Sequence, residues 1–221
     1  MPSITVENYV KQIYLAGQQQ QPTGGQVSMG RLAAAVGVVP GTVTTMVKAL
    51  VADGLVDYEP RGGVTLTRDG ERLALHVLRR HRLVELLLVR VLGLDWSEVH
   101  AEAEVLEHAV SDKVLERIDA LLGSPTVDPH GDPIPSAKGK VDGTRRHSLA
   151  ECTVGRPLRV ARVTDQDPAF LQFIDRCGLV PGAAVTVEGR DASADAVLVR
   201  PDGRRAVTLG GAAAEKVLVE G

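Results

Sequence analysis

Histidines and glutamates recur at regular intervals in the stretch VHAEAEVLEH, residues 99–108. On a helix that turns about 100° per residue, four of these side chains fall within an arc of roughly 100°. The four are His100, Glu104, Glu107 and His108. The neighbouring arc holds the apolar residues Val99, Ala103, Leu106 and Val110, a set expected to pack against a core. Carboxylates and imidazoles without a thiolate favour Mn²⁺ or Fe²⁺, so the pattern predicts a metal-binding face; the ordinary alternative is a solvated polar stripe.

A second His/Glu pair lies upstream, where His81 and Glu85 stand four residues apart on another expected helix. Residues 93–95 (Gly-Leu-Asp) provide a turn between the two helices, which predicts a helical hairpin. In such a hairpin, His81 and Glu85 come near His100. The apolar residues expected to pack the first helix are Leu83, Leu87, Val91 and Leu92.

Both helices belong to a stretch from about residue 73 to 123 that is almost free of Gly and Pro. Residues 124–150 are rich in Pro, Gly, Asp and Ser, which predicts an ordered loop followed by a flexible linker. Short alternating runs such as LRVARV and AVLVRP then recur about every ten residues and predict a small β-barrel. One helix, PAFLQFIDRCG, interrupts these runs and is expected to end at Gly178.

The N-terminal part predicts a DNA-binding domain. Ser28 is an expected N-cap and Gly37 an expected stop for a short helix, and a second helix follows across a tight turn, from about Gly41 to Asp53. Two short helices joined in this way form a helix-turn-helix. Residues 62–63 (Gly-Gly) then provide the turn of a β-hairpin, which is called a wing.

Outward-facing residues of the second helix are expected to meet phosphates and base edges in a major groove. With the wing arginine, the candidate DNA-contacting residues are Pro40, Gly41, Thr42, Thr44, Thr45, Lys48 and Arg61. Residues 1–72 carry six basic and six acidic side chains, so this part is neutral and is expected to need dimerisation for firm DNA binding. The alternative is a helix-turn-helix that does not bind DNA.

Composition bounds the class of protein. The 221 residues, 44% of them hydrophobic, are enough for two or three small domains, and the formal net charge of −3 excludes a strongly basic nucleic-acid-binding protein. Cys152 and Cys177 form no C-x-x-C pair, which argues against a disulfide framework or a thiolate zinc site. We find no long apolar run and no export signal, so the chain is expected to be cytoplasmic and to have no membrane partner.

The order of these motifs resembles one family of regulators. A winged helix-turn-helix is followed by HRLVE, by GLDWSEVHAEAEVLEHAVSD, by DPHGDPIP and by the β tail. Over essentially the whole chain this arrangement is similar to the diphtheria toxin repressor family of metal-dependent transcriptional regulators. The resemblance implies an α+β multidomain protein with a winged helix-turn-helix at 1–72, an all-α metal-binding dimerisation domain at 73–143 and an SH3-like (FeoA-like) small β-barrel at 148–221.

The same resemblance implies a homodimer that binds double-stranded operator DNA when a divalent metal orders its winged domains, and that represses metal-uptake genes. Glu104 stands where iron-responsive members have Cys, which favours the manganese-responsive branch. Mn²⁺ is therefore the expected metal. Fe²⁺ is the alternative, as in an iron-responsive repressor of the same family, and Co²⁺, Zn²⁺ and Cd²⁺ are expected to substitute in vitro.

Carried over residue by residue, the activating site takes Asn8, Glu104, Glu107 and His108. Asn8 is a departure, because iron-responsive members have Met there and manganese-responsive members have Asp. Lys11 also departs, since a manganese-responsive member has a metal-binding carboxylate at that position.

The resemblance also implies an ancillary metal site. Its ligands are His81, Glu85 and His100, completed by Asp165 or Asp167 from the β tail. In manganese-responsive members with a related C-P-H-G loop, the first and third loop residues bind metal, and these positions hold Asp128 and His130 here. The alternative for this loop is a Pro-rich surface turn.

Two other functions stay open. His/Glu clusters on helices also build di-metal enzymes, although the chain has no H-E-x-x-H motif and is not expected to be an enzyme. The second is a winged-helix regulator that answers an organic ligand, and an aromatic content of 3% argues against a stacking pocket for one.

Overall fold

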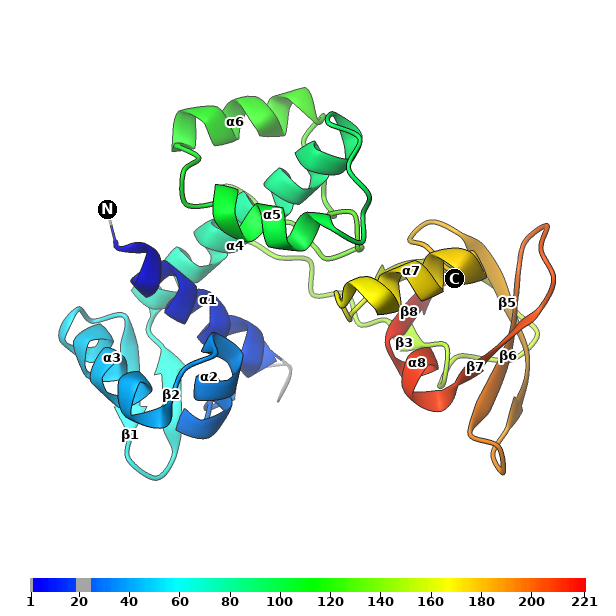
Figure 1. Ribbon diagram of the computed structural model, residues 1–221, viewed down its shortest axis with the longest axis horizontal. Helices are drawn as coiled ribbons and strands as arrows, with labels where there is room; N and C mark the ends of the chain where they lie inside the picture. Colours follow the sequence, from blue (N-terminus) through cyan, green and yellow to red (C-terminus); the bar gives the residue numbers. More distant parts are fainter. Residues whose placement is uncertain (1, 19–24) are drawn as a thin grey trace. The chain divides into compact units, whose positions relative to one another are not determined.

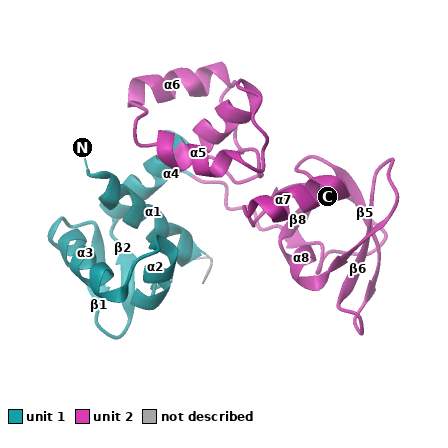
Figure 2. Ribbon diagram, viewed as in Figure 1, with its two compact units in different colours: residues 1–80, 135–140 teal, residues 81–134, 141–221 magenta. Residues whose placement is uncertain are grey.

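The computed structural model describes residues 2–18 and 25–221, and the chain divides into two compact units (Figures 1 and 2). The first comprises residues 1–80 and 135–140, and the second comprises residues 81–134 and 141–221. Helix α4 (Arg68–Arg90) is continuous over 23 residues, so it begins in the first unit and ends in the second. In the described ranges, no single helix has the length and apolar character needed to cross a membrane.

The predicted helix-turn-helix is confirmed in the first unit. It consists of α2 (Met29–Val36) and α3 (Pro40–Ala52), which are bent by 102° from one another. Ser28 accepts a hydrogen bond from the Arg31 amide at the start of α2, and Gly37 ends that helix with a φ of 69°. Helix α1 (Ile4–Gln18) precedes the motif and packs against α2.

The wing follows α3. Strands β1 (Val56–Glu59) and β2 (Gly63–Leu66) pair antiparallel, with Glu59 opposite Gly63 at the turn. Gly63 has a φ of 126° and lies against the backbone of Val27, which leaves no room for a side chain. Apolar side chains from α1, α2, α3 and the wing form one core, which includes Tyr9, Leu32, Val47, Leu50 and Val64.

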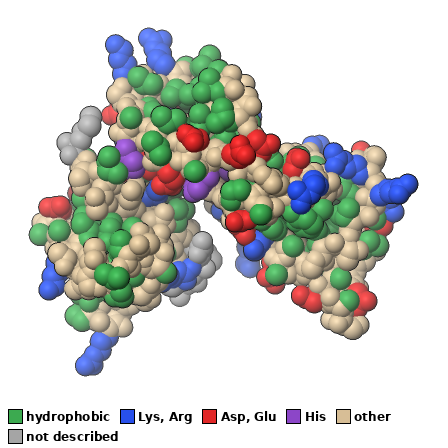
Figure 3. All heavy atoms as spheres, in the orientation of Figure 1, with side chains coloured by type: hydrophobic (Ala, Val, Ile, Leu, Met, Phe, Trp, Pro, Cys, Tyr) green, Lys and Arg blue, Asp and Glu red, His purple; other side chains and the backbone are tan. Residues whose placement is uncertain are grey.

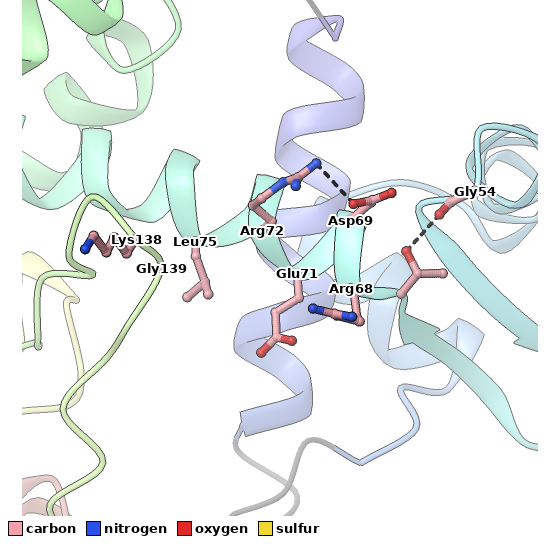
Figure 4. A pocket seen from close by; sticks show the side chains of 9 residues that line it. Gly54, Arg68, Asp69, Glu71, Arg72, Leu75, Lys138 and Gly139 are labelled. Atoms are coloured by element: carbon pink, nitrogen blue, oxygen red, sulfur yellow. Dashed lines mark hydrogen bonds and ion pairs between the residues drawn. The ribbon is translucent and has the colours of Figure 1, made fainter.

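Residues 135–140 return to the first unit and lie beside the start of α4. Arg79 of α4 donates a hydrogen bond to the carbonyl of Pro135 at 2.7 Å. Between this segment and the first turns of α4 lies a cavity of about 680 Å³ (Figure 4). Arg72, on its wall, pairs with Asp69 at 3.1 Å. Part of the stretch predicted as a flexible linker therefore has a defined place in the first unit.

The helical part of the second unit contains the end of α4, α5 (Val99–Leu106) and α6 (Asp112–Leu121). Val99 and Ala103 are buried, as predicted, but Leu106 is 40% exposed. The prediction that Leu106 packs inward is wrong because α5 ends at this residue and the next side chain, Glu107, takes the buried position.

The packing predicted for the end of α4 is only partly correct. Leu83 is buried and Leu87 is partly buried against the helical core. Val91 and Leu92 are 51% and 62% exposed, because α4 ends at Arg90 and the turn that follows points them outward. The turn predicted at residues 93–95 is present, since the chain bends between Arg90 and Val99.

The predicted β-barrel is also confirmed. Six strands form an antiparallel sheet in the order β3-β8-β4-β5-β6-β7. They are β3 (His147–Ser148), β4 (Pro157–Val163), β5 (Ala184–Asp191), β6 (Ala196–Pro201), β7 (Val207–Gly210) and β8 (Val217–Glu220). Strand β8 comes last in sequence but lies between β3 and β4. The helices of this part are α7 (Pro168–Cys177), which ends at Gly178 as predicted, and α8 (Gly211–Glu215).

Candidate metal centre

The hairpin of α4 and α5 brings five potential ligands together, and we call them the first cluster: His81, His100, Glu104, Glu107 and His108. His81 Nε2 lies 3.1 Å from His100 Nδ1, and His81 Nδ1 lies 3.7 Å from Glu104 Oε1. His100 Nε2 is also 3.7 Å from that carboxylate oxygen. These three side chains offer one ligand atom each within 4.8 Å of one another, a spacing that a single cation can bridge.

Glu107 and His108 join the first cluster from beyond the end of α5. Glu107 is completely buried, and its Oε2 lies 2.7 Å from His81 Nδ1. Its other oxygen lies 3.2 Å from His108 Nε2. The helical periodicity predicted from the sequence stops at Leu106, yet the turn that follows keeps both side chains on the same side as Glu104.

A second cluster consists of Glu85, Asp128 and His130, all buried, with one ligand atom each within 4.8 Å of one another. Glu85 comes from α4, one turn after His81, and the other two come from the loop that follows α6. Glu85 Oε1 lies 2.9 Å from His81 Nε2 and 3.2 Å from His100 Nδ1. The two clusters are therefore neighbours, joined through Glu85.

Burial and neighbouring groups shift the pKa values of Glu85 and Asp128, the two carboxyl groups of the second cluster. Burial acts to raise the pKa of Glu85, but hydrogen bonds with His100 and His81 outweigh it and hold that pKa well below its ordinary value. Burial, together with the carboxylates of Asp132 and Glu85, raises the pKa of Asp128 well above its ordinary value, although the Arg82 guanidinium opposes the rise. The pKa values of these two neighbouring carboxyl groups are thus shifted in opposite directions.

Two carboxylate oxygens in the second cluster fit a divalent cation, although Arg82 Nε lies 3.7 Å from one of them, Asp128 Oδ2. Glu85 Oε2 and Asp128 Oδ2 are buried and lack a hydrogen-bond partner among the described residues. A buried carboxylate oxygen without a partner is unfavourable by itself, and a cation in contact with it removes that penalty. With His130, the cluster offers an oxygen, oxygen and nitrogen donor set, which suits Mn²⁺ and Fe²⁺.

His130 is held in the tautomer that can bind a metal. Its Nε2 lies 2.8 Å from the carbonyl oxygen of Trp96, and a carbonyl only accepts hydrogen bonds, so Nε2 carries the proton. In the neutral ring, Nδ1 then carries the lone pair, and it lies 3.8 Å from Glu85 Oε2 and 3.5 Å from Gln166 Nε2. The Trp96 carbonyl therefore orients this imidazole towards the two carboxylates.

The loop that carries Asp128 and His130 is fixed by its own hydrogen bonds. Asp128 Oδ1 accepts from the amides of His130 and Asp132, and Arg82 of α4 donates to the carbonyl of Pro133 at 2.5 Å. Gly131 has a φ of 85°, and a side chain there would collide with the carbonyl of Ala161. The Pro-rich loop is thus a buried, preorganised element and not a surface turn.

Three family models match consecutive parts of the chain. Residues 1–64 match the iron dependent repressor N-terminal DNA binding domain, residues 67–136 its metal binding and dimerisation domain, and residues 147–221 the FeoA domain. The iron-dependent repressor IdeR of Mycobacterium tuberculosis is 33% identical, over 98% of this chain and 96% of that protein. The diphtheria toxin repressor of Corynebacterium diphtheriae is 30% identical, over 85% of each. The chain belongs to the diphtheria toxin repressor family of metal-dependent transcriptional regulators.

A solved structure of another member supports the same fold. A manganese-dependent transcriptional repressor in complex with manganese is 42% identical, with a TM-score of 0.87 over 97% of this chain and 98% of that one. Known members of this family are transcriptional repressors, so the architecture and the regulatory class of the chain are those that its sequence motifs predicted.

In this family member, the two aspartates considered as further ligands have other partners. Asp165 pairs with Lys216 at 2.6 Å, and Asp167 accepts the Phe170 amide as the N-cap of α7. The side chain between them, Gln166, approaches His130, with its Nε2 3.5 Å from Nδ1. Sequence reasoning missed Gln166, because the acidic residues on either side of it were the stronger signal for a metal ligand.

The remaining predicted metal ligand, Asn8, lies on the N-terminal helix α1. Asn8 is half-buried on α1, and Lys11, one turn later, is buried. A buried ion pair between Glu7 and Arg80, at 2.6 Å, fixes α1 to α4 within the first unit. Asn8 belongs to the first unit and both clusters belong to the second, so its role as a metal ligand stays a prediction.

The predicted DNA-contacting residues lie at the start of α3 and on the wing, where nearly all of them are exposed; Thr44 is half-buried. The hydroxyls of Thr44 and Thr45 donate to the carbonyls of Pro40 and Gly41, one turn back. These hydroxyls still have lone pairs that can accept a hydrogen bond, and Lys48 is exposed on the same helix.

Proposed function

We propose that this protein is a metal-dependent DNA-binding transcriptional regulator, chiefly a repressor of metal-uptake genes, which acts in the cytoplasm on double-stranded operator DNA. The observation that carries the proposal is the second cluster, where two buried carboxylate oxygens that accept no hydrogen bond from the described residues lie beside an imidazole held in the metal-binding tautomer. We infer a role in regulated binding and not in catalysis, in line with the iron- and manganese-dependent repressors that the chain resembles.

The geometry favours a division of ligands different from the one that the sequence predicts. We assign one metal ion to His81, Glu104, Glu107 and His108, because the two carboxylates converge on His81. We assign a second ion to Glu85, Asp128 and His130. His100 lies between the two, within 3.2 Å of Glu85 and 3.7 Å of Glu104.

Helix α4 supports a route from metal to DNA. His81 and Glu85 lie on the same continuous helix whose first turns belong to the DNA-binding unit. A bound cation supplies positive charge that draws the carboxylates of α5 and of the Asp128 loop towards α4. We infer that this fixes α4 in one orientation and thereby spaces the recognition helices of a dimer for successive half-sites.

Exposed apolar side chains support a homodimer. Val105, Val114 and Leu121, on α5 and α6, are 73%, 49% and 67% exposed. Figure 3 shows hydrophobic side chains gathered over this helical part of the chain. Since apolar patches of this kind mark interfaces, we propose that a second copy of the chain covers them.

The donor set favours Mn²⁺, with Fe²⁺ as the alternative, because both clusters use only oxygen and nitrogen. We expect Mn²⁺ to tighten binding of the full-length protein to duplex DNA from its own upstream region by about 5–150-fold. The test is a fluorescence anisotropy titration of that duplex with and without Mn²⁺, against a duplex of scrambled sequence. Equal affinity with Mn²⁺ and with a chelator would contradict the proposal.

Glu104→Cys tests which metal the first cluster prefers. A thiolate is a softer ligand than a carboxylate, so we expect the variant to respond more strongly to Fe²⁺ or Co²⁺ and less strongly to Mn²⁺ than the original protein does. The measurement is metal-dependent DNA anisotropy with each ion in turn. Glu102→Cys is the matched control, because Glu102 is exposed on the same helix. An unchanged ranking of metals in Glu104→Cys would count against this assignment.

A further inference from the structure

The segment of residues 133–140 is attached to α4 at successive turns of the helix. Arg82 donates a hydrogen bond to the carbonyl of Pro133 at 2.5 Å. Arg79, one turn earlier on α4, donates to the carbonyl of Pro135 at 2.7 Å. Alternate carbonyls of the segment therefore meet two arginines on one face of the helix, and the segment and the helix run in opposite directions.

The attachment continues towards the start of α4. Leu75 lies one turn before Arg79 and is only 7% exposed. Gly139 lies over it, because a Cβ atom on Gly139 would stand 3.5 Å from Leu75 Cδ1. Figure 4 shows this turn of the segment beside Leu75. The spacing of Leu75, Arg79 and Arg82 places all three side chains within an arc of roughly 60° on α4.

The segment itself has few accessible conformations. Pro133 and Pro135 have restricted backbones, and Ile134 between them is buried in the core of the helical part. The turn that follows is closed by the Ser136 hydroxyl oxygen, which accepts a hydrogen bond from the Lys140 amide at 3.0 Å. A segment that is ordered before it docks loses little conformational entropy on docking, so few contacts are enough to hold it.

The boundary between the two compact units crosses both the helix and the segment. On α4 it falls between Arg80 and His81, and on the segment it falls between Ile134 and Pro135. Residues 135–140 enter the first unit and leave it again. The chain itself therefore connects the end of the metal-binding loop to the unit that contains the winged helix-turn-helix.

The second cluster lies directly before this segment. Asp128 and His130 precede Pro133 by five and three residues, and Glu85 follows Arg82 by one turn on α4. A cation held by these three ligands would attach the loop to α4 at one further turn. Because a ligand that binds only the attached form stabilises that form by mass action, metal binding at this cluster should hold the segment more firmly on the helix.

We propose that the 133–140 segment is a positioning element that transmits metal binding at the second cluster to the DNA-binding unit. The loop that holds the cation is continuous with the segment, and the segment fixes the first turns of α4. The effect on DNA rests on the proposed function. The attachment of the segment to α4 can be measured without DNA.

Trypsin reports how often the segment leaves α4, since cleavage of a folded protein proceeds through local opening. Lys138 and Lys140 are exposed in the turn, and Arg145, also exposed, follows it as an internal reference. We expect saturating Mn²⁺ to slow cleavage after the two lysines by about tenfold or more and to leave cleavage after Arg145 unchanged. Mass spectrometry of the fragments gives each rate. Equal rates at the lysines with and without Mn²⁺ overturn the proposal.

Two variants of the metal clusters show which ion is responsible. Asp128→Asn is expected to lose the protection of the lysines by Mn²⁺, because the second cluster then lacks a charged ligand. Glu107→Ala is expected to keep it, because Glu107 belongs to the first cluster. Protection that survives in Asp128→Asn and disappears in Glu107→Ala contradicts the assignment to the second cluster.

Arg79→Met tests the attachment itself. Loss of the hydrogen bond to Pro135 should speed cleavage after the lysines in the metal-free protein by about fivefold or more, and should reduce the Mn²⁺-dependent gain in affinity for the upstream duplex by a similar factor. Arg72→Met is the control, since Arg72 lies two turns earlier on α4 and its side chain is 80% exposed. If Arg79→Met does not fold, Ser136→Ala decides, because it opens the turn at an exposed position.

The two measurements separate this inference from the proposed function. A gain in DNA affinity that is as large in Arg79→Met and Ser136→Ala as in Arg72→Met overturns the inference and leaves the proposed function standing. Absence of any Mn²⁺-dependent gain in the original protein would instead contradict the proposed function, and with it the effect on DNA, whatever the rates of trypsin cleavage.

Discussion

Glu107→Ala is expected to lose the metal-dependent gain in operator affinity, about 5–150-fold, while the protein still dimerises. Glu107 is completely buried and its two oxygens contact His81 and His108, so its removal takes the central carboxylate out of the first cluster. The apolar patch proposed for the dimer lies on exposed residues of α5 and α6, which the substitution leaves in place. Anisotropy titrations with Mn²⁺ measure the first effect, and sedimentation measures the second.

Glu102→Ala is the matched control for this prediction. Glu102 is on α5 but is exposed, and it falls outside the arc that faces α4. It should keep Mn²⁺-dependent binding at the level of the original protein. Metal-dependent binding by Glu107→Ala as tight as that of Glu102→Ala would rule out the role assigned to the first cluster.

Asp128→Asn is expected to stabilise the metal-free protein by about 1–3 kcal/mol and to weaken metal binding at the second cluster by at least about 10–100-fold. Asn keeps the oxygen that accepts from the His130 and Asp132 amides and removes the charge that burial disfavours. The same carboxylate oxygen that destabilises the empty fold is the one proposed to bind the cation.

The sign of the pH dependence follows from the raised pKa of Asp128. A carboxyl whose pKa is higher in the folded than in the unfolded protein stabilises the fold at low pH, and that contribution falls as pH rises above the ordinary pKa of Asp. The advantage of Asp128→Asn should therefore grow with pH from about 4 upwards. Urea unfolding of the metal-free protein at several pH values, with metal affinity measured by calorimetry, tests both parts.

Asp132→Asn provides the contrast. Asp132 pairs with Arg162 and Arg82, so its neutralisation leaves one half-buried and one buried guanidinium group with less compensation. This variant should lose stability at neutral pH. If Asp128→Asn lost stability in the same way, its carboxylate would be an ordinary structural group and the metal assignment for the loop would fail.

Much of the fold was predictable because its signals are local. Ser28 and Gly37 define α2 through capping hydrogen bonds that involve only neighbouring residues, and Gly63 defines the wing turn. The approach of His81 and Glu85 to His100 was also predictable. A four-residue spacing places His81 and Glu85 on one face of α4, and the short turn that follows brings α5 against that face.

The division of ligands between the two clusters was less predictable. The spacing of side chains predicts one helix over residues 99–108, but α5 ends at Leu106. The directions of the Glu107 and His108 side chains therefore depend on the turn that follows the helix. Glu85 lies near Asp128 and His130 only because the loop after α6 folds back on α4, and the sequence around Glu85 does not indicate this. The ion pair of Asp165 could not be predicted either, because its partner Lys216 follows 51 residues later and comes close only when the barrel forms.

The order of strands in the barrel also determines when this part of the protein can fold during synthesis. Strand β8 is the last to be made but lies inside the sheet, between β3 and β4. A nascent chain that lacks residues 217–220 therefore has no bridge between β3 and the rest of the sheet. The barrel can assemble only after residue 220 has left the ribosome, whereas the winged helix-turn-helix, built from contiguous elements, can form long before.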